Sequence, residues 1–245
     1  MPRFFVPSEN FCENLVKITG EDAFHIARAL RMAVGNPITV CDMHGAEYSC
    51  RLTKIRDEAC ECEILSKNEG KTESPVYVSL YMAYPKGDKL ETVTQKAVEL
   101  GASEIIPFES SRCIKKPKAD KAERDMARLS RIAEEAAKQC GRSRLVKILP
   151  SLSYREMLNA ISKSDASLFC YEGDGTKSLK EVLNSLPPSV KTIAVIVGSE
   201  GGFSVDEAES AKSSGAFMVN LGPRILRCET APSYILSALS YHFEL

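Results

Sequence analysis

From Val76 to the end of the sequence, short apolar runs alternate with segments whose apolar residues recur at every third or fourth position. The runs are typical of strands buried on both faces, and the spaced residues are typical of amphipathic helices. Because consecutive parallel strands need a crossover between them, this alternation predicts an α/β fold with a mostly parallel sheet covered on both faces. The expected strands cover residues 76–83, 104–108, 146–149, 166–171, 192–197 and 217–221.

Three segments between and after these strands carry a clear helical stripe. The first runs from Leu90 to Leu100 and ends at Gly101, a residue type that favours the left-handed conformation after a helix. The second covers residues 126–140 and the third covers residues 231–242. Most of the apolar residues in these stripes are expected to belong to the core.

The first 72 residues have a different pattern. Their apolar runs are short, alternate in polarity and are separated by turn-forming residues, which favours a small β-barrel or sandwich. One helix-like insert, residues 23–32, places Phe24 and Leu30 along one side. Residues 67–75 are polar and contain glycine and proline, so they are expected to form a linker. The sequence therefore predicts two domains, 1–72 and 75–245.

The composition limits the class of protein. Hydrophobic residues make up 44% and charged residues 27% of the chain, a balance that allows a sizeable core and does not favour disorder. We find no apolar stretch long enough to span a bilayer and no signal-peptide pattern at the start, so we expect a cytoplasmic protein. The nine cysteines lack a CxxC pair and the three histidines are far apart, so neither a disulfide framework nor a metal site is expected.

Basic residues gather in one part of a chain whose net charge is only −1. Residues 112–147 contain twelve Lys or Arg against five Asp or Glu. Some of these residues precede a helix and others share one side of it, an arrangement that fits phosphate binding as well as a solvated helix face. The candidate phosphate contacts in this segment are Arg112, Lys115, Lys116, Lys118, Arg124, Arg128 and Arg131.

The loop after the strand at 192–197 is unusually rich in glycine. It reads Gly198-Ser-Glu-Gly-Gly-Phe203, and Ser204 and Glu207 then form a capping-box pattern that starts a helix. In parallel sheets ligands bind at the carboxyl ends of the strands. Three glycines within five residues allow close approach of the backbone, so this loop is expected to wrap a ligand or to form a flexible turn.

The loop after the last strand, residues 221–232, carries more charge than a simple turn needs. Arg224, Arg227 and Glu229 precede the final helix, for which Thr230 is the expected N-cap. This excess of charge suggests contact with a substrate. Residues 173–178 resemble fragments of nucleotide-binding motifs but complete none of them, so they are expected to form a surface loop.

Together the two loops closely resemble the signature loops of the bacterial ribosomal RNA small-subunit methyltransferase E family, a member of the SPOUT class. The matching sequences are VGSEGGFS at 197–204 and LGPRILRCETA at 221–231. Ser199 stands where the family usually has proline, which removes rigidity but no functional group. The resemblance extends in order along the whole chain, through residues 2–5, 25–35, 85–89, 95–101 and 134–142.

This resemblance implies a SPOUT-type sheet with a C-terminal trefoil knot, preceded by a PUA-like RNA-binding barrel. It implies S-adenosyl-L-methionine (SAM) as the cofactor and small-subunit rRNA, or the assembled small ribosomal subunit, as the partner. The implied reaction is methylation of N3 of a uridine in 16S rRNA. A homodimer is also implied, and one side of the final helix is small enough for close packing: Ser233, Leu236, Ser237 and Ser240.

The resemblance also assigns residues to the site. Arg224 and Arg227 would stabilise a uridine anion, and either Glu200 or Glu229 would accept its proton, although an Arg–Glu pair between the loops explains Glu229 equally well. Arg28 and Arg31 would add RNA contacts from the barrel. The expected cofactor-binding residues are Val197, Gly198, Glu200, Gly201, Gly202, Leu221, Gly222, Ile225, Leu226 and Thr230.

Two alternatives remain open from the sequence. One is a SPOUT methyltransferase that acts on a ribose 2′-hydroxyl group or on tRNA. The other is a non-catalytic RNA-binding protein of ribosome assembly, against which the intact glycines of both loops argue.

Overall fold

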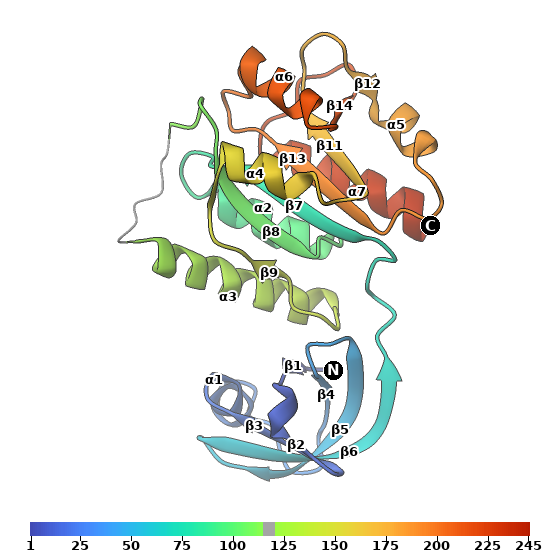
Figure 1. Ribbon diagram of the computed structural model, residues 1–245. Coiled ribbons are helices and arrows are strands. Elements are labelled where there is room, and N and C mark those ends of the chain that lie inside the picture. Colours follow the sequence, from blue (N-terminus) through green and yellow to red (C-terminus); the bar gives the residue numbers. More distant parts are fainter. Residues whose placement is uncertain (115–120) are drawn as a thin grey trace. The chain divides into compact units, whose positions relative to one another are not determined.

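The computed structural model describes residues 1–114 and 121–245, and the chain forms two compact units (Figure 1). The first unit comprises Met1–Glu73 and Ala137–Leu145, and the second comprises Ser74–Ala136 and Val146–Leu245. The sequence predicted a boundary at the linker but not the transfer of residues 137–145 to the first unit. Residues 137–140 belong to the helix predicted over 126–140, so their pattern contains no sign of a change of unit.

The first unit is built on a six-stranded sheet in the order β1-β4-β5-β6-β3-β2. Its pairings are antiparallel except for β1 with β4, and β5 and β6 form a long curved pair (Figure 1). The strands are β1 (Arg3–Phe5), β2 (Phe11–Cys12), β3 (Leu15–Thr19), β4 (Pro37–Cys41), β5 (Ala46–Ile55) and β6 (Ala59–Glu69). A 3-10 turn, η1 (Ser8–Asn10), precedes β2.

Cysteines serve as small apolar residues in this unit. Cys50, Cys60 and Cys62 are almost fully buried beside Ile38 and Leu52. A thiol side chain is small and weakly polar, so it packs well between larger aliphatic groups. All nine cysteines are free, in agreement with the absence of a disulfide framework from the sequence pattern.

The helix-like insert differs from the expectation. It consists of α1 (Glu21–Phe24) and a π-helical turn, η2 (His25–Ala29). Ala23 and Ile26 are buried, whereas Phe24 is 56% and Leu30 41% exposed. The expected apolar side is therefore wrong by one position, because the short helix packs its Ala23 side against β3 and β6 and the wider π turn interrupts the α-helical spacing.

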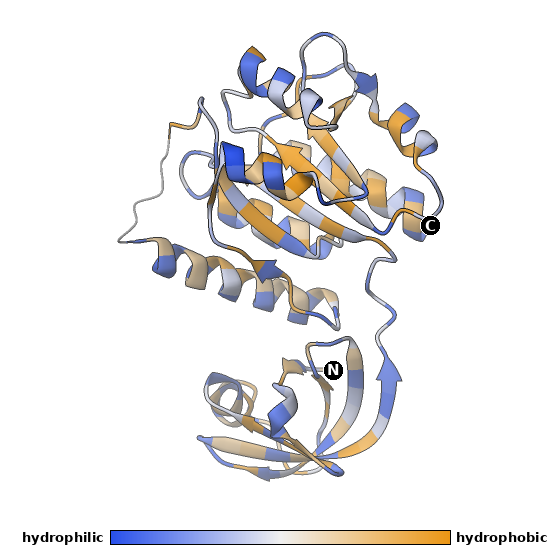
Figure 2. Cartoon of the chain, in the orientation of Figure 1, coloured by the Kyte–Doolittle hydropathy of each residue, from blue (hydrophilic) through white to orange (hydrophobic). Residues whose placement is uncertain are grey.

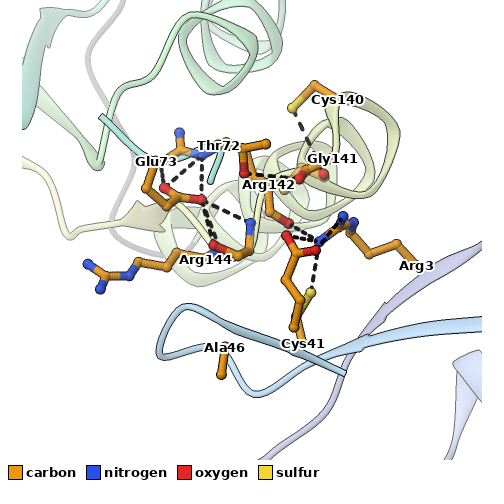
Figure 3. Close-up of polar contacts among 12 residues, drawn as sticks. Arg3, Cys41, Ala46, Thr72, Glu73, Cys140, Gly141, Arg142 and Arg144 are labelled. Atoms are coloured by element: carbon orange, nitrogen blue, oxygen red, sulfur yellow. Dashed lines mark hydrogen bonds and ion pairs between the residues drawn. The ribbon is translucent and has the colours of Figure 1, made fainter. Parts of the chain in front are cut away.

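Residues 137–145 join the first unit through a network of polar contacts around Glu73 (Figure 3). The Glu73 carboxylate accepts hydrogen bonds from Arg142 Nη2 at 2.6 Å, Ser143 N at 2.9 Å and Arg144 N at 3.1 Å. Arg3 Nη1 donates to the carbonyl oxygen of Arg142 at 3.1 Å. Arg142 is only 5% exposed, so this member of the basic segment is a buried structural residue.

The second unit is built on an eight-stranded sheet in which every pairing between described residues is parallel. The order is β10-β8-β7-β13-β11-β14-β12, with β9 paired to β8. All the predicted strands are present, and the two-residue strands β10 and β12 were not predicted. The strands are β7 (Tyr77–Ala83), β8 (Glu104–Glu109), β9 (Lys147–Ile148), β10 (Leu152–Ser153), β11 (Ala166–Cys170), β12 (Lys177–Ser178), β13 (Thr192–Val197) and β14 (Phe217–Asn220).

Helices cover this sheet, and its central strands are the most apolar part of the unit (Figure 2). Three of the helices begin with a complete capping box, and the box predicted at Ser204 and Glu207 is confirmed. The segment predicted as a surface loop, 173–178, ends in one of these caps, because Ser178 starts a helix. The helices are α2 (Lys89–Glu99), α3 (Ala122–Cys140), α4 (Tyr154–Ile161), α5 (Leu179–Ser185), α6 (Val205–Ser213) and α7 (Thr230–Glu244).

The last helix corrects two expectations. Thr230 is not the N-cap but the first helical residue, because Glu229 already has a right-handed helical backbone conformation. Leu236 was expected on a free side of the helix but is 1% exposed, since α7 packs on β13 and α2. Tyr234 and Tyr241 are 45% and 75% exposed and form the free side instead.

Among the described residues, we find no helix that is both long and apolar enough to cross a membrane.

Candidate functional site

A cavity of about 710 Å³ lies in the second unit where three neighbouring strands end. Its walls come from the loops after β11, β13 and β14, and Lys89 and Arg112 complete them. The carboxyl ends of parallel strands meet at one edge of a sheet, which is where α/β proteins bind ligands. The sequence predicted the loops after β13 and β14 but not the loop after β11.

Most of the residues predicted for the site line this cavity. They are Val197, Gly198, Glu200, Gly202, Leu221, Gly222, Arg224, Ile225, Leu226, Arg227 and Glu229. The structure does not place Gly201 and Thr230 in the lining. Thr230 is exposed in the first turn of α7, and Gly201 packs against Arg112 instead.

The loop after β13 closes tightly on itself. Gly202 N donates to Ser199 O at 2.9 Å, and Gly202 has a φ of +61°, a value that favours glycine. A Cβ on Gly198 would lie 3.1 Å from Gly202 Cα, so this position also has no room for a side chain. Phe203 anchors the end of the loop in the core, with its ring centroid 4.2 Å from that of Phe169.

Arg112 supports this loop from the segment after β8. Its Nη1 atom donates to the Gly201 carbonyl oxygen at 3.0 Å, and Ser199 Oγ donates to the Arg112 carbonyl oxygen at 3.4 Å. The buried carboxylate of Glu207 fixes the same segment, because Ser111 N and Oγ donate to it at 2.7 and 2.9 Å. Arg112 was predicted as a phosphate contact, and the structure places it in the wall of the cavity.

The loop after β14 presents its polar groups to solvent. Arg224 and Arg227 are exposed, and neither guanidinium forms a hydrogen bond or ion pair with the part of the chain that the structure describes. Ile225, between them, is 82% exposed. Gly222 starts the loop with a φ of +101°, which again favours glycine. The loop therefore holds two available cations and one exposed apolar side chain at the edge of the cavity.

Lys89, the first residue of α2, connects the two loops. Its Nζ atom lies 2.9 Å from Glu200 Oε1 and 3.2 Å from Glu229 Oε2. The partner of Glu229 is thus a lysine rather than an arginine of the neighbouring loop. The sequence did not predict Lys89. A usable signal was present, because a cation at the start of a helix interacts unfavourably with the helix dipole.

The electrostatics of this group follow from its hydrogen bonds. Burial acts to raise the pKa of Glu200, but hydrogen bonds from Lys89 and from backbone N–H groups outweigh it, so the pKa lies below its ordinary value. A backbone N–H, with Cys228 and Lys89, likewise lowers the pKa of Glu229. The bond to Glu200 raises the pKa of Lys89. Burial, followed by the contact with Glu229, raises the pKa of the Cys228 thiol to about 12, so this thiol is protonated at neutral pH.

The loop after β11 forms the third wall, through Tyr171, Glu172 and Gly173. Gly173 packs on the ring of Tyr171, where a Cβ would come within 2.4 Å of a ring carbon. Sequence reasoning treated this segment as surface because it completes no motif. It directly follows the strand predicted at 166–171, and this position was the signal that could have found it.

The remaining candidate RNA contacts lie elsewhere in the two units. Arg124, Arg128 and Arg131 are exposed on α3, where Arg128 Nη2 lies 2.8 Å from Glu91 Oε2. Arg28 and Arg31 are exposed in the first unit. Arg28 Nε donates to both carboxylate oxygens of Asp57, at 2.9 and 3.0 Å. The other three candidates, Lys115, Lys116 and Lys118, lie outside the described residues.

Within residues 1–114 and 121–245, no three His, Cys, Asp or Glu side chains are grouped so as to hold a metal ion.

Comparison with known proteins gives the chain a family. Residues 72–240 match the model of an RNA methyltransferase domain, and residues 18–65 match that of an RNA methyltransferase PUA domain. Ribosomal RNA small subunit methyltransferase E of Bacillus subtilis (strain 168) is 34% identical over 232 residues, which cover 93% of this chain and 90% of the relative.

Two solved structures with SAM bound are also similar to the chain. A ribosomal RNA small subunit methyltransferase E from Neisseria gonorrhoeae is 31% identical, with a TM-score of 0.88 over 98% of this chain and 97% of that one. A methyltransferase from Legionella pneumophila is 28% identical, with a TM-score of 0.86 over 98% and 96% of the two chains. The first unit accordingly contains a PUA domain, and the chain belongs to the ribosomal RNA small subunit methyltransferase E family.

Proposed function

We propose that this chain transfers the methyl group of SAM to N3 of a uridine in small-subunit rRNA. The observation that supports this most directly is the cavity itself. The loops after β13 and β14, which carry the family's sequence signature, both line it, and two available arginines stand at its edge. The similar structures from Neisseria gonorrhoeae and Legionella pneumophila were solved with SAM.

The residues of the cavity fit this cofactor. A volume of about 710 Å³ is in the roughly 300–1,000 Å³ range of small-molecule sites. Gly198 and Gly202 of one loop, and Gly222 of the other, contribute backbone to the lining of the cavity. The proposed binding residues are Val197, Gly198, Glu200, Gly202, Leu221, Gly222, Ile225 and Leu226.

When bound, SAM supplies an electrophilic methyl group on a positively charged sulfur. N3 must lose its proton as it takes the methyl group, and the deprotonated uridine carries a negative charge that is shared with its carbonyl oxygens until the methyl group is transferred. Arg224 and Arg227 are placed to stabilise this charge, since both line the cavity and neither is committed to a carboxylate among the described residues. Their contribution is electrostatic and positional.

The remaining parts of the proposal follow the family resemblance. We propose a trefoil knot at the loops after β13 and β14, and a homodimer with a mass twice that of the 26.9 kDa chain. The exposed side of α7, with Tyr234 and Tyr241, is the candidate contact. Arg28 and Arg31 of the first unit, with the basic residues of α3 and of 115–118, would bind phosphates of the RNA.

The decisive experiment uses small ribosomal subunits from a strain that lacks the gene. Incubation with the purified protein and SAM, followed by nuclease digestion and mass spectrometry of nucleosides, should yield 3-methyluridine. A 2′-O-methylated nucleoside, or methylation of added tRNA alone, would replace the proposal with another substrate. Binding of RNA without SAM binding in calorimetry would identify a non-catalytic RNA-binding protein.

A further inference from the structure

Lys89 is the one charged residue of α2 that lines the cavity among the described residues, and it binds both loops at once. The loop after β13 contributes Glu200, and the loop after β14 contributes Glu229. These loops follow different strands, and β11 lies between β13 and β14 in the sheet. Their separation at the cavity is therefore not fixed by direct pairing of the two strands.

We infer that Lys89 is a positioning residue that sets the spacing of the two cofactor loops, and that Glu200 and Glu229 serve as its partners rather than as proton acceptors. This inference rests on the proposed function of the cavity and assigns a part of that function to three residues.

The contacts around Glu200 attach its side chain to the beginning of α2 at two points. Lys86 N donates to the Glu200 carboxylate at 3.0 and 3.3 Å, in addition to the bond from Lys89. The segment that leads into α2 thus presents one backbone donor, and the first residue of α2 presents one ammonium group, to the same side chain. These contacts hold Glu200 against the beginning of α2, and they also hold the loop that carries it.

On the other loop, Glu229 is held between a cation and a buried thiol. Cys228 Sγ lies 3.2 Å from Glu229 Oε2, and Lys89 Nζ lies 3.2 Å from the same oxygen. The Cys228 side chain is 7% exposed, so it ties this end of the loop to the interior. Both contacts are made by Glu229, which immediately precedes α7.

Charge explains why a cation is required. Glu200 and Glu229 contact the same nitrogen atom, so the two carboxylates are close neighbours. Without Lys89 they would repel each other, since like charges in a partly buried site disfavour one another. Removal of the ammonium group would thus both break two ion pairs and push the two loops apart.

The same contacts argue against a role for either carboxylate as a base. Each is engaged by Lys89, and the pKa of each lies below its ordinary value, which makes it a weak proton acceptor. Uridine would then lose its N3 proton to solvent, with the arginines stabilising the anion. The fraction of ionised uridine rises about tenfold per pH unit below its pKa, and the rate should follow it.

The main test compares Lys89→Met with Lys89→Arg and with Lys96→Met as the matched control. Lys96 is on the same helix and pairs with Glu99 on its exposed side, 3.0 Å away. Calorimetry with SAM should show a dissociation constant about 10- to 100-fold higher for Lys89→Met, the range for lost hydrogen bonds to charged groups. Lys89→Arg should recover most of this loss, and Lys96→Met should match the wild type.

A kinetic measurement separates positioning from a general loss of structure. Lys89→Met should raise the KM for SAM more than it lowers kcat, with an unchanged circular dichroism spectrum. If Lys89→Met does not fold, Glu229→Gln and Glu200→Gln carry the same test, because each removes one partner and keeps the side-chain shape. SAM affinity equal to that of the wild type in these variants would overturn the inference.

The pH dependence of the single-turnover rate tests the second part. Between pH 6 and 8 its logarithm should rise with a slope near one in the wild type and in Glu229→Gln. A flat profile in the wild type that becomes sloped in Glu229→Gln would make Glu229 the base. A wild-type protein that binds no SAM would instead reject the proposed function and leave the Lys89 contacts without a cofactor to position.

Discussion

Glu73 and Arg142 are 69 residues apart in the sequence and form an ion pair at 2.6 Å within the first unit (Figure 3). Their side chains are 15% and 6% exposed. Thr72 Oγ1 adds a hydrogen bond to the Gly141 carbonyl oxygen at 3.1 Å. Thus the end of the N-terminal segment holds the segment that follows α3, and the first unit is closed by residues from the middle of the chain.

Replacing Arg142 by methionine should strongly destabilise the protein. The substitution leaves the Glu73 carboxylate buried without its main cation, and the loss of one partner of a buried pair costs about 3–5 kcal/mol. Urea unfolding followed by circular dichroism measures this change. Arg128→Met removes an exposed pair with Glu91 and should cost only about 0–1 kcal/mol. Equal effects of the two substitutions would show that the Glu73 network adds little.

The same network should make stability depend on pH. Burial acts to raise the pKa of Glu73, but hydrogen bonds from Arg142, Ser143 and Arg144 outweigh it and hold the folded pKa below the ordinary value of 4.5. The stabilisation is therefore complete above pH 4.5 and is lost as the pH falls through the folded value. Urea unfolding of the wild type and of Glu73→Gln should give free energies that differ at pH 7 and converge toward pH 3. A difference that grows on acidification would reverse the assigned sign.

Substitutions of Gly201 should affect SAM binding in a graded manner. A Cβ at this position would lie 3.0 Å from Arg112 Cβ and 3.3 Å from the Arg112 carbonyl oxygen. Alanine requires a shift of a few tenths of an ångström, whereas the two methyl groups of valine must displace the loop. We expect Gly201→Val to abolish SAM binding in calorimetry, Gly201→Ala to weaken it, and both to keep the wild-type circular dichroism spectrum. Unchanged affinity of Gly201→Val would place the cofactor elsewhere.

Arg224→Ala should lower the methylation rate at saturating RNA more than it lowers RNA affinity. Arg224 lines the cavity and is available for the reacting base.

Replacement of Lys115, Lys116 and Lys118 together by alanine should have the opposite effect, because these residues are proposed to contact phosphates. RNA binding should weaken, and the log–log slope against salt should fall by about one for each contact that is lost. Filter-binding titrations at several salt concentrations, with single-turnover rates, measure both effects, and an unchanged slope for the triple variant would assign these lysines to a solvated surface.

The sequence by itself determined the parts of the protein that depend on local pattern. The expected strands of the parallel sheet appear where apolar runs occur, since a buried strand needs a continuous apolar stretch. The capping box of Ser204 and Glu207 involves residues three apart, so it was visible before any fold was known. The loop glycines were visible for the same reason, because backbone freedom belongs to the residue type.

Only the tertiary structure decided which distant groups meet. Lys89 contacts Glu200 and Glu229 because the start of α2 and the ends of β13 and β14 reach one cavity. Arg142 counts as one more positive charge in the sequence, yet it is buried against Glu73. Local periodicity reports which side of an element is apolar, whereas the contacts of a charged side chain depend on the packing of elements that are far apart in the chain. The identity of the ion-pair partners, and with it the division between binding and structural charges, was therefore set by the fold.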